Sequence, residues 1–246
     1  MNTGKVGIII EARSNSSRLK NKHFLKIKDK PIIFHMIERL KLIKNVDEII
    51  IATTSRKDDR KFIKICTSTK IKIFRGSEKN VMKRVLDAAR KFKLQIICEI
   101  TGDCPFVDYE IVENLINKFQ RSNFDYFSMK NSGYPHGVGA QLFTLQSLVK
   151  SYKMVKSKYD LEHVTSHFKR NKKKFKISYV KAPKKLKYPS IKLLLDEKLD
   201  YLFLNKLFLY FYKKKNIFFK TKDIVNVIKR KKITLDNFSV KRNAIT

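Results

Sequence analysis

Three polar segments of this chain could do chemistry, and each begins where an apolar run ends. The first, residues 11–22, reads E-A-R-S-N-S-S-R-L-K-N-K. Its small polar residues allow backbone N–H groups to turn toward an anion, and Arg13, Arg18 and Lys22 add fixed positive charge. Triphosphate chemistry needs such groups, because negative charge builds up on the departing pyrophosphate. The segment fits a phosphate-binding loop or an ordinary basic surface loop, and it is not a GxxxxGK[ST] loop.

The second segment is T-G-D-C-P at residues 101–105. Gly102 permits a tight turn and close approach of a ligand, and Asp103 would then point from a strand end into a cleft. A carboxylate in that place suits Mg²⁺, which takes one or two carboxylates together with phosphate oxygens and water. Taken alone, the segment favours a turn in which Asp103 accepts hydrogen bonds from backbone amides.

The third segment is Asp196, which directly follows three leucines and precedes Asp200 by one helical turn. Asp196 could be a second metal ligand or the N-cap of a helix, and by itself the sequence favours the cap. A further polar group, E-H-V-T at residues 162–165, places His163 four residues before His167. The HExxH pattern and a third ligand are missing, so this spacing favours a structural or substrate-contacting role over zinc binding.

The elements that must position these segments alternate through the first half of the chain. Apolar runs predict buried strands at residues 6–10, 48–52, 71–74 and 95–100. Three helices are predicted between them: one that begins at Pro31, one over 57–67 and one capped by Ser77. A fourth helix, capped by Asp108, is predicted after the last strand. Such alternation predicts an α/β fold, a mostly parallel sheet flanked by helices. Ligands bind at the carboxyl ends of such strands, so the loops after Ile10, Ala52 and Ile100 are the expected site.

The second half is less regular. It predicts strands at 125–129, 175–180 and 191–195, helices over 142–155 and 161–168, a glycine-containing loop at 132–139 and two closing helices. We therefore expect a single domain over 1–246. It comprises an α/β core at 5–124, an irregular insertion at 125–190, and a closing strand and helices at 191–246.

The formal charge of +34 admits a nucleic-acid-binding protein as an alternative. Lysine predominates over arginine and is spread through predicted helices, whereas base recognition and bidentate phosphate binding favour arginine. Most of these lysines are therefore interpreted as a solvated surface, and no specific nucleic-acid partner is expected. The positive field would still attract a nucleoside triphosphate.

Several features predict a cytoplasmic protein. Cys66, Cys98 and Cys104 show no CxxC spacing and fit reduced thiols. The chain opens without the pattern of a signal peptide. Its most apolar late segment, residues 199–212, is too short to span a membrane. The hydrophobic content of 43% indicates a folded core.

Taken together, the motifs resemble the cytidylyltransferases of the CMP-KDO and CMP-sialate synthetase superfamily, most closely the branch of spore-coat polysaccharide biosynthesis protein F. That branch carries Q-A-R-x-x-S-x-R-L-P-G-K where this chain has residues 11–22. Its A-T-S/T motif with paired aspartates matches 52–54 and Asp58-Asp59, and its R-G-S-E-x-x-V-x-x-R block matches 75–84. The T-G-D-C-P and E-H-V-T blocks are complete. The resemblance extends from about Val6 to the helix after Asp200.

The resemblance implies a nucleotide-diphospho-sugar transferase (glycosyltransferase-A-like) fold that transfers CMP from CTP to a sugar acid, releases pyrophosphate and serves surface polysaccharide or glycan synthesis. It implies Mg²⁺ on Asp103 and Asp196, catalytic roles for Arg13, Arg18, Lys22 and Asp103, and a homodimer with its interface near 125–190. The implied nucleotide-binding residues are Ala12, Arg13, Ser14, Arg18, Lys22, Thr53, Arg75, Ser77 and Asp103, and the implied substrate-binding residues are Tyr134, His136, Gln141, Glu162 and His163. Guanylyl or uridylyl transfer to a sugar phosphate on the same fold is the enzymatic alternative.

Three departures from the family pattern bear on substrate choice. The usual Pro-Gly of the first loop is Lys20-Asn21 here. The acidic pattern after a Pro-Asp-Gly turn is replaced by residues 139–141, G-A-Q, and the turn itself reads Y-P-H-G. The Arg-x-Thr-Val-Asp pattern is K-L-L-L-D at 192–196. The metal positions are kept while some expected substrate contacts are not, which predicts an altered acceptor; an inactive relative is the alternative.

Overall fold

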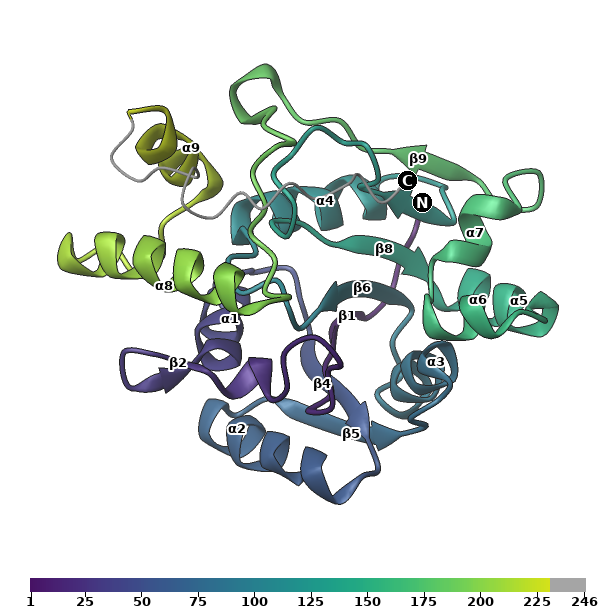
Figure 1. The fold of residues 1–246 in the computed structure, drawn as a ribbon. Coiled ribbons are helices and arrows are strands. Elements are labelled where there is room, and N and C mark those ends of the chain that lie inside the picture. Colours follow the sequence, from purple (N-terminus) through teal and green to yellow (C-terminus); the bar gives the residue numbers. More distant parts are fainter. Residues whose placement is uncertain (231–246) are drawn as a thin grey trace.

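The computed structural model describes residues 1–230, and a seven-stranded sheet of order β5-β4-β1-β6-β8-β7-β9 forms its centre (Figure 1). The strands are β1 Val6–Glu11, β4 Glu48–Thr54, β5 Lys72–Gly76, β6 Ile96–Thr101, β7 Tyr126–Ser128, β8 Gln141–Thr144 and β9 Ile177–Tyr179. Strand β8 runs antiparallel to β6 and β7, and the other pairs are parallel. The predicted mostly parallel sheet is confirmed.

Helices cover both faces of this sheet. They are α1 Ile32–Leu40, α2 Lys61–Thr69, α3 Val81–Lys91, α4 Tyr109–Gln120, α5 Leu145–Met154, α6 Lys158–Glu162, α7 Ser166–Arg170, α8 Lys198–Lys213 and α9 Thr221–Lys229, with 3₁₀ turns at Lys22–Phe24, Lys57–Arg60 and Lys184–Leu186 and a small hairpin of β2 Lys26–Ile27 and β3 Lys30–Pro31. As predicted, Pro31 directly precedes α1, and Asp108 caps α4 by accepting from the backbone N–H of Glu110 and Ile111.

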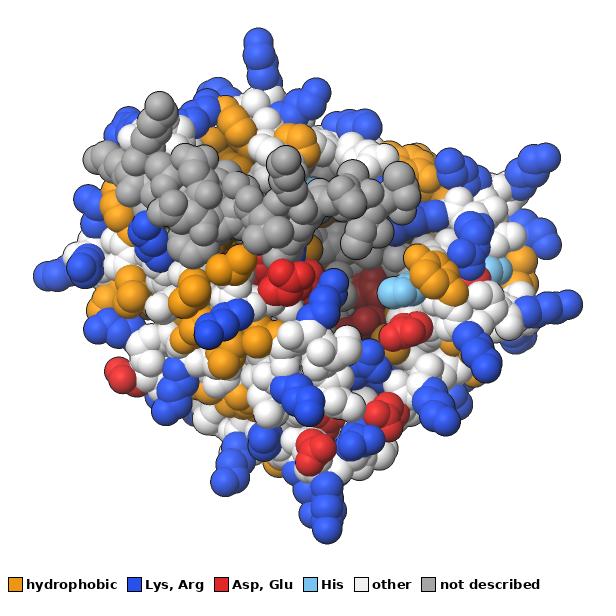
Figure 2. Space-filling view, viewed as in Figure 1, with side chains coloured by type: hydrophobic (Ala, Val, Ile, Leu, Met, Phe, Trp, Pro, Cys, Tyr) orange, Lys and Arg blue, Asp and Glu red, His pale blue; other side chains and the backbone are white. Residues whose placement is uncertain are grey.

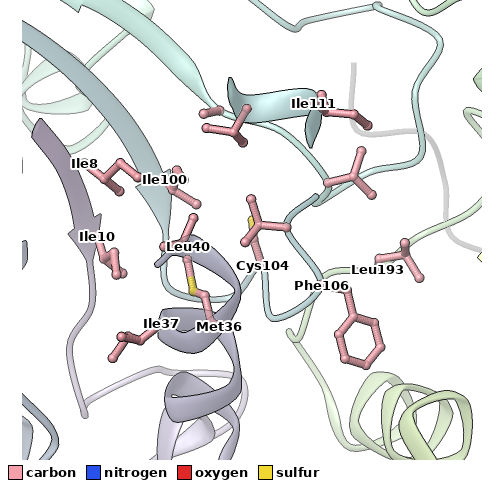
Figure 3. Packing of buried hydrophobic residues seen from close by; sticks show 14 of the residues in the cluster. Ile8, Ile10, Met36, Ile37, Leu40, Ile100, Cys104, Phe106, Ile111 and Leu193 are labelled. Carbon is pink, nitrogen blue, oxygen red and sulfur yellow. The ribbon is translucent and has the colours of Figure 1, made fainter. Parts of the chain in front are cut away.

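The central strands are apolar on both faces because both faces are covered. Alternate residues of β1 belong to two separate clusters of buried side chains. Ile8 and Ile10 pack with α1, α2, α4 and α8, whereas Ile9 packs with α3 and α5. Figure 3 shows the first cluster, in which Ile8, Ile10 and Ile100 of the sheet face Met36 of α1. This two-sided core fixes the sheet whose carboxyl edge carries the candidate site.

Two predicted helix starts are wrong. Ser77 does not cap α3; Asn80 does, by accepting from the backbone N–H of Lys83 at 2.7 Å. Ser77 lies one turn earlier, where its hydroxyl accepts from the backbone N–H of Asn80 at 3.1 Å. The helix predicted over 142–155 is strand β8 followed by α5. Pairing of β8 with β6 is a contact between distant segments, which local helical periodicity does not reveal.

Two further predictions in the second half are also wrong in detail. The helix predicted over 161–168 is divided into α6 and α7 by a turn at residues 163–165. The strand predicted over 191–195 makes a single bridge, between His136 and Lys192. Backbone hydrogen bonds from Leu193 N to His136 O (2.8 Å) and from Leu195 N to Asp103 O (2.8 Å) nevertheless hold this segment against the site. The two closing helices, α8 and α9, are present as predicted, and the last part of the predicted closing region, 231–246, lies outside the described residues.

Within residues 1–230, no helix combines the length and the apolar composition needed to cross a membrane.

Candidate functional site

The loops that follow β1, β4 and β6 meet at one edge of the sheet, because these three strands are parallel neighbours. Gly102, in the loop after β6, donates its backbone N–H to the carbonyl of Glu11 at 2.8 Å. A Cβ atom at position 102 would lie 3.0 Å from that carbonyl and 3.0 Å from the Cβ of Ala12. Glycine therefore allows the loop that carries Asp103 to pack directly against the loop that carries the arginines.

Lys22 joins the two predicted metal ligands. Its Nζ lies 3.2 Å from Oδ2 of Asp103 and 3.3 Å from Oδ1 of Asp196, and its side chain is 9% exposed. The structure thus brings together a strand-end carboxylate and one from a distant segment. The helix-cap interpretation of Asp196 is wrong, because Glu197 is the N-cap of α8 and forms a capping box with Asp200. The carboxylate of Asp103 accepts a hydrogen bond from Lys22 and not from the backbone amides of its turn, so Asp103 faces the site.

Asp196 is surrounded by positive charge. Besides Lys22, Arg18 Nη2 lies 3.1 Å from its Oδ1 and Lys192 Nζ lies 3.2 Å from its Oδ2. Burial acts to raise the pKa of Asp196, but attraction to Lys22, Lys192 and Arg18 outweighs burial and holds this pKa below its usual value. Asp196 therefore remains a carboxylate throughout the neutral range, as a metal ligand must.

The chemistry of these donors fits Mg²⁺. The carboxylates of Asp103 and Asp196 converge on the ammonium group of Lys22, so the space between them suits a cation. No group of three or more His, Cys, Asp or Glu residues that could hold a metal occurs among residues 1–230. Asp103 and Asp196 could thus supply only part of a coordination sphere. Mg²⁺ typically completes such a sphere with water and phosphate oxygens.

Asp59 fixes the phosphate-binding loop from beneath. Its Oδ1 accepts from the backbone N–H of Ser14 at 2.7 Å, its Oδ2 accepts from the hydroxyl of Thr54, and it is 1% exposed. Burial acts to raise the pKa of Asp59, yet the hydrogen bonds from Thr54 and Ser14 outweigh it and lower this pKa. Asp59 was not among the predicted site residues. Its signal in the sequence was the Asp58-Asp59 pair of the family pattern.

Asn21 explains how the loop tolerates the loss of glycine. Its backbone is left-handed, with φ 55° and ψ 24°, and its N–H donates to the carbonyl of Ser14 at 3.0 Å. Glycine adopts this conformation freely, and asparagine is one of the few other residues that visit it routinely. Asn21 therefore adopts a conformation that glycine could also take at this position, while Lys20 is exposed.

The E-H-V-T segment reaches the first loop. Glu162 Oε1 lies 3.3 Å from Nη2 of Arg13, and both side chains are about half exposed. The ring of His163 lies 4.4 Å from that of Tyr159. His167, which the sequence paired with His163, instead has its Nδ1 2.8 Å from the hydroxyl of Ser151.

Five predicted nucleotide-binding residues are buried or make hydrogen bonds within the protein. Ala12, Ser14 and Thr53 are buried. Arg75 donates from Nη2 to the carbonyls of Ser55 (2.7 Å) and Arg56 (2.9 Å), which holds the turn after β4. The carbonyl of Ser77 accepts from Arg84 at 2.6 Å. In this structure these residues shape the site.

A cavity of about 330 Å³ adjoins the loop after β6. Thr101, Cys104 and the predicted substrate-binding residues Tyr134, His136 and Gln141 line it. Gly137, at φ 91°, packs so closely that a Cβ atom there would lie 2.9 Å from the carbonyl of Leu193. The wall formed by residues 132–139 is thereby held against the segment that carries Asp196.

The surface around the site carries both signs of charge. Figure 2 shows acidic and basic side chains side by side around a hollow near the middle of this face, whereas lysines and arginines predominate toward the outline. Basic groups beside two carboxylates, next to a cavity of small-molecule size, suit a phosphate-bearing ligand and a second, smaller ligand.

Comparison with known proteins gives one consistent result. The family model described as "Cytidylyltransferase" matches residues 7–231. The uncharacterized protein MJ1063 of Methanocaldococcus jannaschii is 39% identical over 193 residues, which cover 78% of this chain and 79% of that protein. The spore coat polysaccharide biosynthesis protein SpsF of Bacillus subtilis is 27% identical over 199 residues, covering 78% and 82% of the two chains.

A 3-deoxy-manno-octulosonate cytidylyltransferase of Anaeromyxobacter is 32% identical over 117 residues, which cover 47% of each chain. Among solved structures, a cytidylyltransferase from Leptospira borgpetersenii superposes with a TM-score of 0.88 at 29% identity. The match covers 97% of this chain and 99% of the other.

Proposed function

Because this chain belongs to the cytidylyltransferase family, we propose that it transfers CMP from CTP to a hydroxyl group of a sugar acid, with release of pyrophosphate. The resemblance seen in the sequence is confirmed at the level of the family. The observation that carries the proposal is the meeting of Asp103, Asp196 and Lys22 at the carboxyl edge of the sheet, beside a cavity. A nucleotide would bind over the first loop, and the acceptor would enter the cavity.

On the donor side, Arg13, Arg18 and Lys22 would bind the phosphates of CTP. Arg13 and Arg18 are partly exposed and form ion pairs with Glu162 and Asp196, respectively, so they can turn toward a triphosphate. Their positive charges would stabilise the negative charge that accumulates on pyrophosphate as the bond to the α-phosphorus breaks. The loop that carries them is anchored beforehand through Ser14, so little reorganisation is needed when the nucleotide binds.

Asp103 and Asp196 would hold Mg²⁺. The ion would supply positive charge that lowers the cost of bringing an anionic acceptor to an anionic triphosphate. Lys22 lies between the two carboxylates, and its ammonium group would also contribute positive charge for the phosphates. The dependence of the reaction on this metal is part of the proposal.

On the acceptor side, the composition of the cavity supports an acid. Lys130 and Lys169 line it together with Tyr134, His136 and Gln141. Ammonium groups attract a carboxylate, and the other polar side chains offer hydrogen bonds to hydroxyl groups. A volume of about 330 Å³ lies at the lower end of the range for small-molecule sites. The relatives include a spore coat polysaccharide biosynthesis protein and a 3-deoxy-manno-octulosonate cytidylyltransferase, which supports the same acceptor class and a role in polysaccharide synthesis.

The test is release of pyrophosphate by the purified protein. Each nucleoside triphosphate is combined with 3-deoxy-manno-octulosonate, N-acetylneuraminate and a panel of sugar phosphates, with and without MgCl₂. We expect release with CTP and a sugar acid, and only with the metal. Release with GTP or UTP and a sugar phosphate would contradict the proposed donor and acceptor.

A homodimer, with residues 125–190 near the interface, stays a prediction from the family resemblance. Light scattering coupled to size-exclusion chromatography would give a mass near twice 29.1 kDa if the chain forms a dimer, and a mass near 29.1 kDa would contradict this prediction.

A further inference from the structure

One wall of the cavity carries a buried carboxyl group that the proposed chemistry does not use. Glu99, in β6, lines the cavity and is 5% exposed. It lies opposite Gln141 in the register between β6 and β8, and Gln141 Nε2 donates to Glu99 Oε2 at 3.3 Å. Glu99 lies two positions before Thr101, the last residue of the strand, which is about 7 Å along the strand. Glu99 therefore faces a part of the acceptor that lies away from the reacting hydroxyl group.

The amide of Gln141 is held in one orientation. Its Oε1 accepts from the hydroxyl of Thr165 at 3.1 Å and from the hydroxyl of Tyr126, so its NH₂ group is directed to Glu99. An amide NH₂ group can donate two hydrogen bonds. Among the described residues, one N–H of this group donates to Glu99. Its second N–H could donate to a ligand beside the carboxyl group of Glu99.

Glu11 lies behind Glu99, on the side away from Gln141. The carboxyl groups of Glu11 and Glu99 interact with each other, and each affects the pKa of the other. Burial raises the pKa of both, and the neighbouring negative charge raises that of Glu99 further, while Arg84 attracts Glu11 and Lys169 attracts Glu99. The Oε1 atom of Glu11 is buried without a hydrogen-bond partner in the described part of the chain.

These contacts form a short polar row at the wall of the cavity. It runs from Glu11 through Glu99 to Gln141, and Arg84 attracts the carboxyl group of Glu11. Glu99 and Gln141, which line the cavity, present an oxygen acceptor and an N–H donor next to each other. A pair of adjacent hydroxyl groups matches this arrangement, because one hydroxyl can donate to the carboxyl group while the other accepts from the amide. A buried polar site of this kind discriminates strongly against a ligand that lacks the matching group.

We propose that Glu99, backed by Glu11 and paired with Gln141, determines acceptor specificity by binding two adjacent hydroxyl groups of the sugar acid. The inference rests on the proposed function, because it assigns the cavity to the acceptor. It adds the substrate feature that this chain selects: a vicinal diol remote from the hydroxyl that attacks CTP.

The experiment compares Glu99→Gln with wild type in steady-state pyrophosphate release. The acceptor is whichever of 3-deoxy-manno-octulosonate and N-acetylneuraminate the wild type uses better, together with its monodeoxy analogues. We expect Glu99→Gln to raise the KM for the acceptor about tenfold, with the KM for CTP changed less than about twofold, because the amide NH₂ group that replaces one carboxyl oxygen cannot accept the hydrogen bond from the acceptor hydroxyl. Glu38→Gln, at a surface ion pair with Lys41, is the matched control and should change neither constant.

A second variant guards against a folding defect at position 99. Gln141→Met keeps the approximate volume and removes the amide, and it should raise the same KM. One monodeoxy acceptor should be used about tenfold less well by the wild type, and Glu99→Gln should no longer distinguish it from the parent sugar.

An unchanged acceptor KM in both folded variants would overturn this inference and leave the proposed function standing. No pyrophosphate release by the wild type with CTP and either sugar acid would overturn the proposed function and this inference together. The two failures are therefore told apart by the wild-type measurement.

Discussion

The Nζ atom of Lys22 lies 3.2 Å from Oδ2 of Asp103, although 81 residues separate the two along the chain. Lys22 belongs to the loop after β1, and Asp103 to the loop after β6, the neighbouring strand. The same ammonium group lies 3.3 Å from Asp196, so a single cation holds both carboxylates in place. This contact links the phosphate-binding loop to the proposed metal position.

Asp103→Asn should abolish metal-dependent pyrophosphate release and leave the fold intact. The amide keeps the shape of the side chain but removes the charge that would hold Mg²⁺. Activity is measured as pyrophosphate release, and folding as the thermal unfolding midpoint. Asp87→Asn, at an exposed ion pair with Lys83, is the matched control. Full activity in a folded Asp103→Asn protein would contradict the assignment of Asp103 as a metal ligand. Asp196→Asn should behave like Asp103→Asn.

Arg18→Ala should lower kcat/KM for CTP by about ten- to a hundredfold. A charge-assisted hydrogen bond to phosphate contributes about 1.5–3 kcal/mol, and each 1.4 kcal/mol is a factor of ten. The Arg18 side chain is 57% exposed, so its removal should change the free energy of unfolding by less than about 0.5 kcal/mol. Arg90→Ala on the exposed face of α3 serves as the control. A CTP dependence equal to wild type would remove Arg18 from the phosphate site.

Asp59→Ala should raise the KM for CTP and destabilise the protein by about 1–3 kcal/mol. The substitution leaves the backbone N–H of Ser14 without its acceptor, and an unsatisfied buried donor carries a cost of that size. The neighbouring Asp58→Ala is the control, because the Asp58 side chain is 64% exposed and its ion-pair partner Arg56 is 3.7 Å away. Equal effects of the two substitutions on the KM for CTP would show that Asp59 does not position the loop.

The double variant Lys20→Pro/Asn21→Gly should keep or raise activity. Asn21 already has the left-handed backbone that glycine adopts without strain, so the substitution restores the family sequence without moving the turn. Asn21→Ala is the informative companion, and it should lose about 1 kcal/mol of stability because alanine is strained there. A loss of more than about tenfold in kcat/KM for CTP in the double variant would indicate that Lys20 contacts phosphate.

Glu99→Gln should make the protein more stable at pH 7 than the wild type, with a difference that shrinks as the pH falls toward 4.5. The pKa of Glu99 in the folded protein is raised well above 4.5 by burial and by Glu11, so above pH 4.5 the unfolded chain loses a proton that the folded chain keeps. The wild type therefore loses about 1.4 kcal/mol of stability for each pH unit by which the pH rises between the unfolded-state and folded-state pKa values of Glu99.

Chemical denaturation at several pH values measures this difference. The charged groups that act on Glu99 are Glu11 and Lys169, Arg84 acts on Glu11, and all three remain in the variant. Glu38→Gln should show no pH-dependent difference from the wild type. A Glu99→Gln protein whose stability parallels the wild type from pH 4.5 to pH 7 would show that Glu99 is ionised at neutral pH.

The sequence by itself determined the α/β class, the parallel core and the three loops that carry the site. Apolar runs such as that of β1, which are buried on both faces, and starts such as Pro31 and Asp108 depend on local chemistry, so they can be recognised without the fold. The motifs in their order along the chain also indicated the family, because residue types within short segments can be compared without knowledge of the fold.

Only the tertiary structure decided which distant groups meet. Strand β8 was predicted as part of a helix, because its pairing with β6 depends on residues more than forty positions away. The sequence by itself favoured Asp196 as a helix cap, whereas in the fold it contacts Lys22, 174 residues earlier in the chain. Glu11 and Gln141 belong to segments that the motifs marked, but Glu99 belongs to no motif, and the row from Glu11 through Glu99 to Gln141 was not predicted because it joins three strands. Contacts of this kind arise from sheet order and register, and local sequence patterns do not encode either.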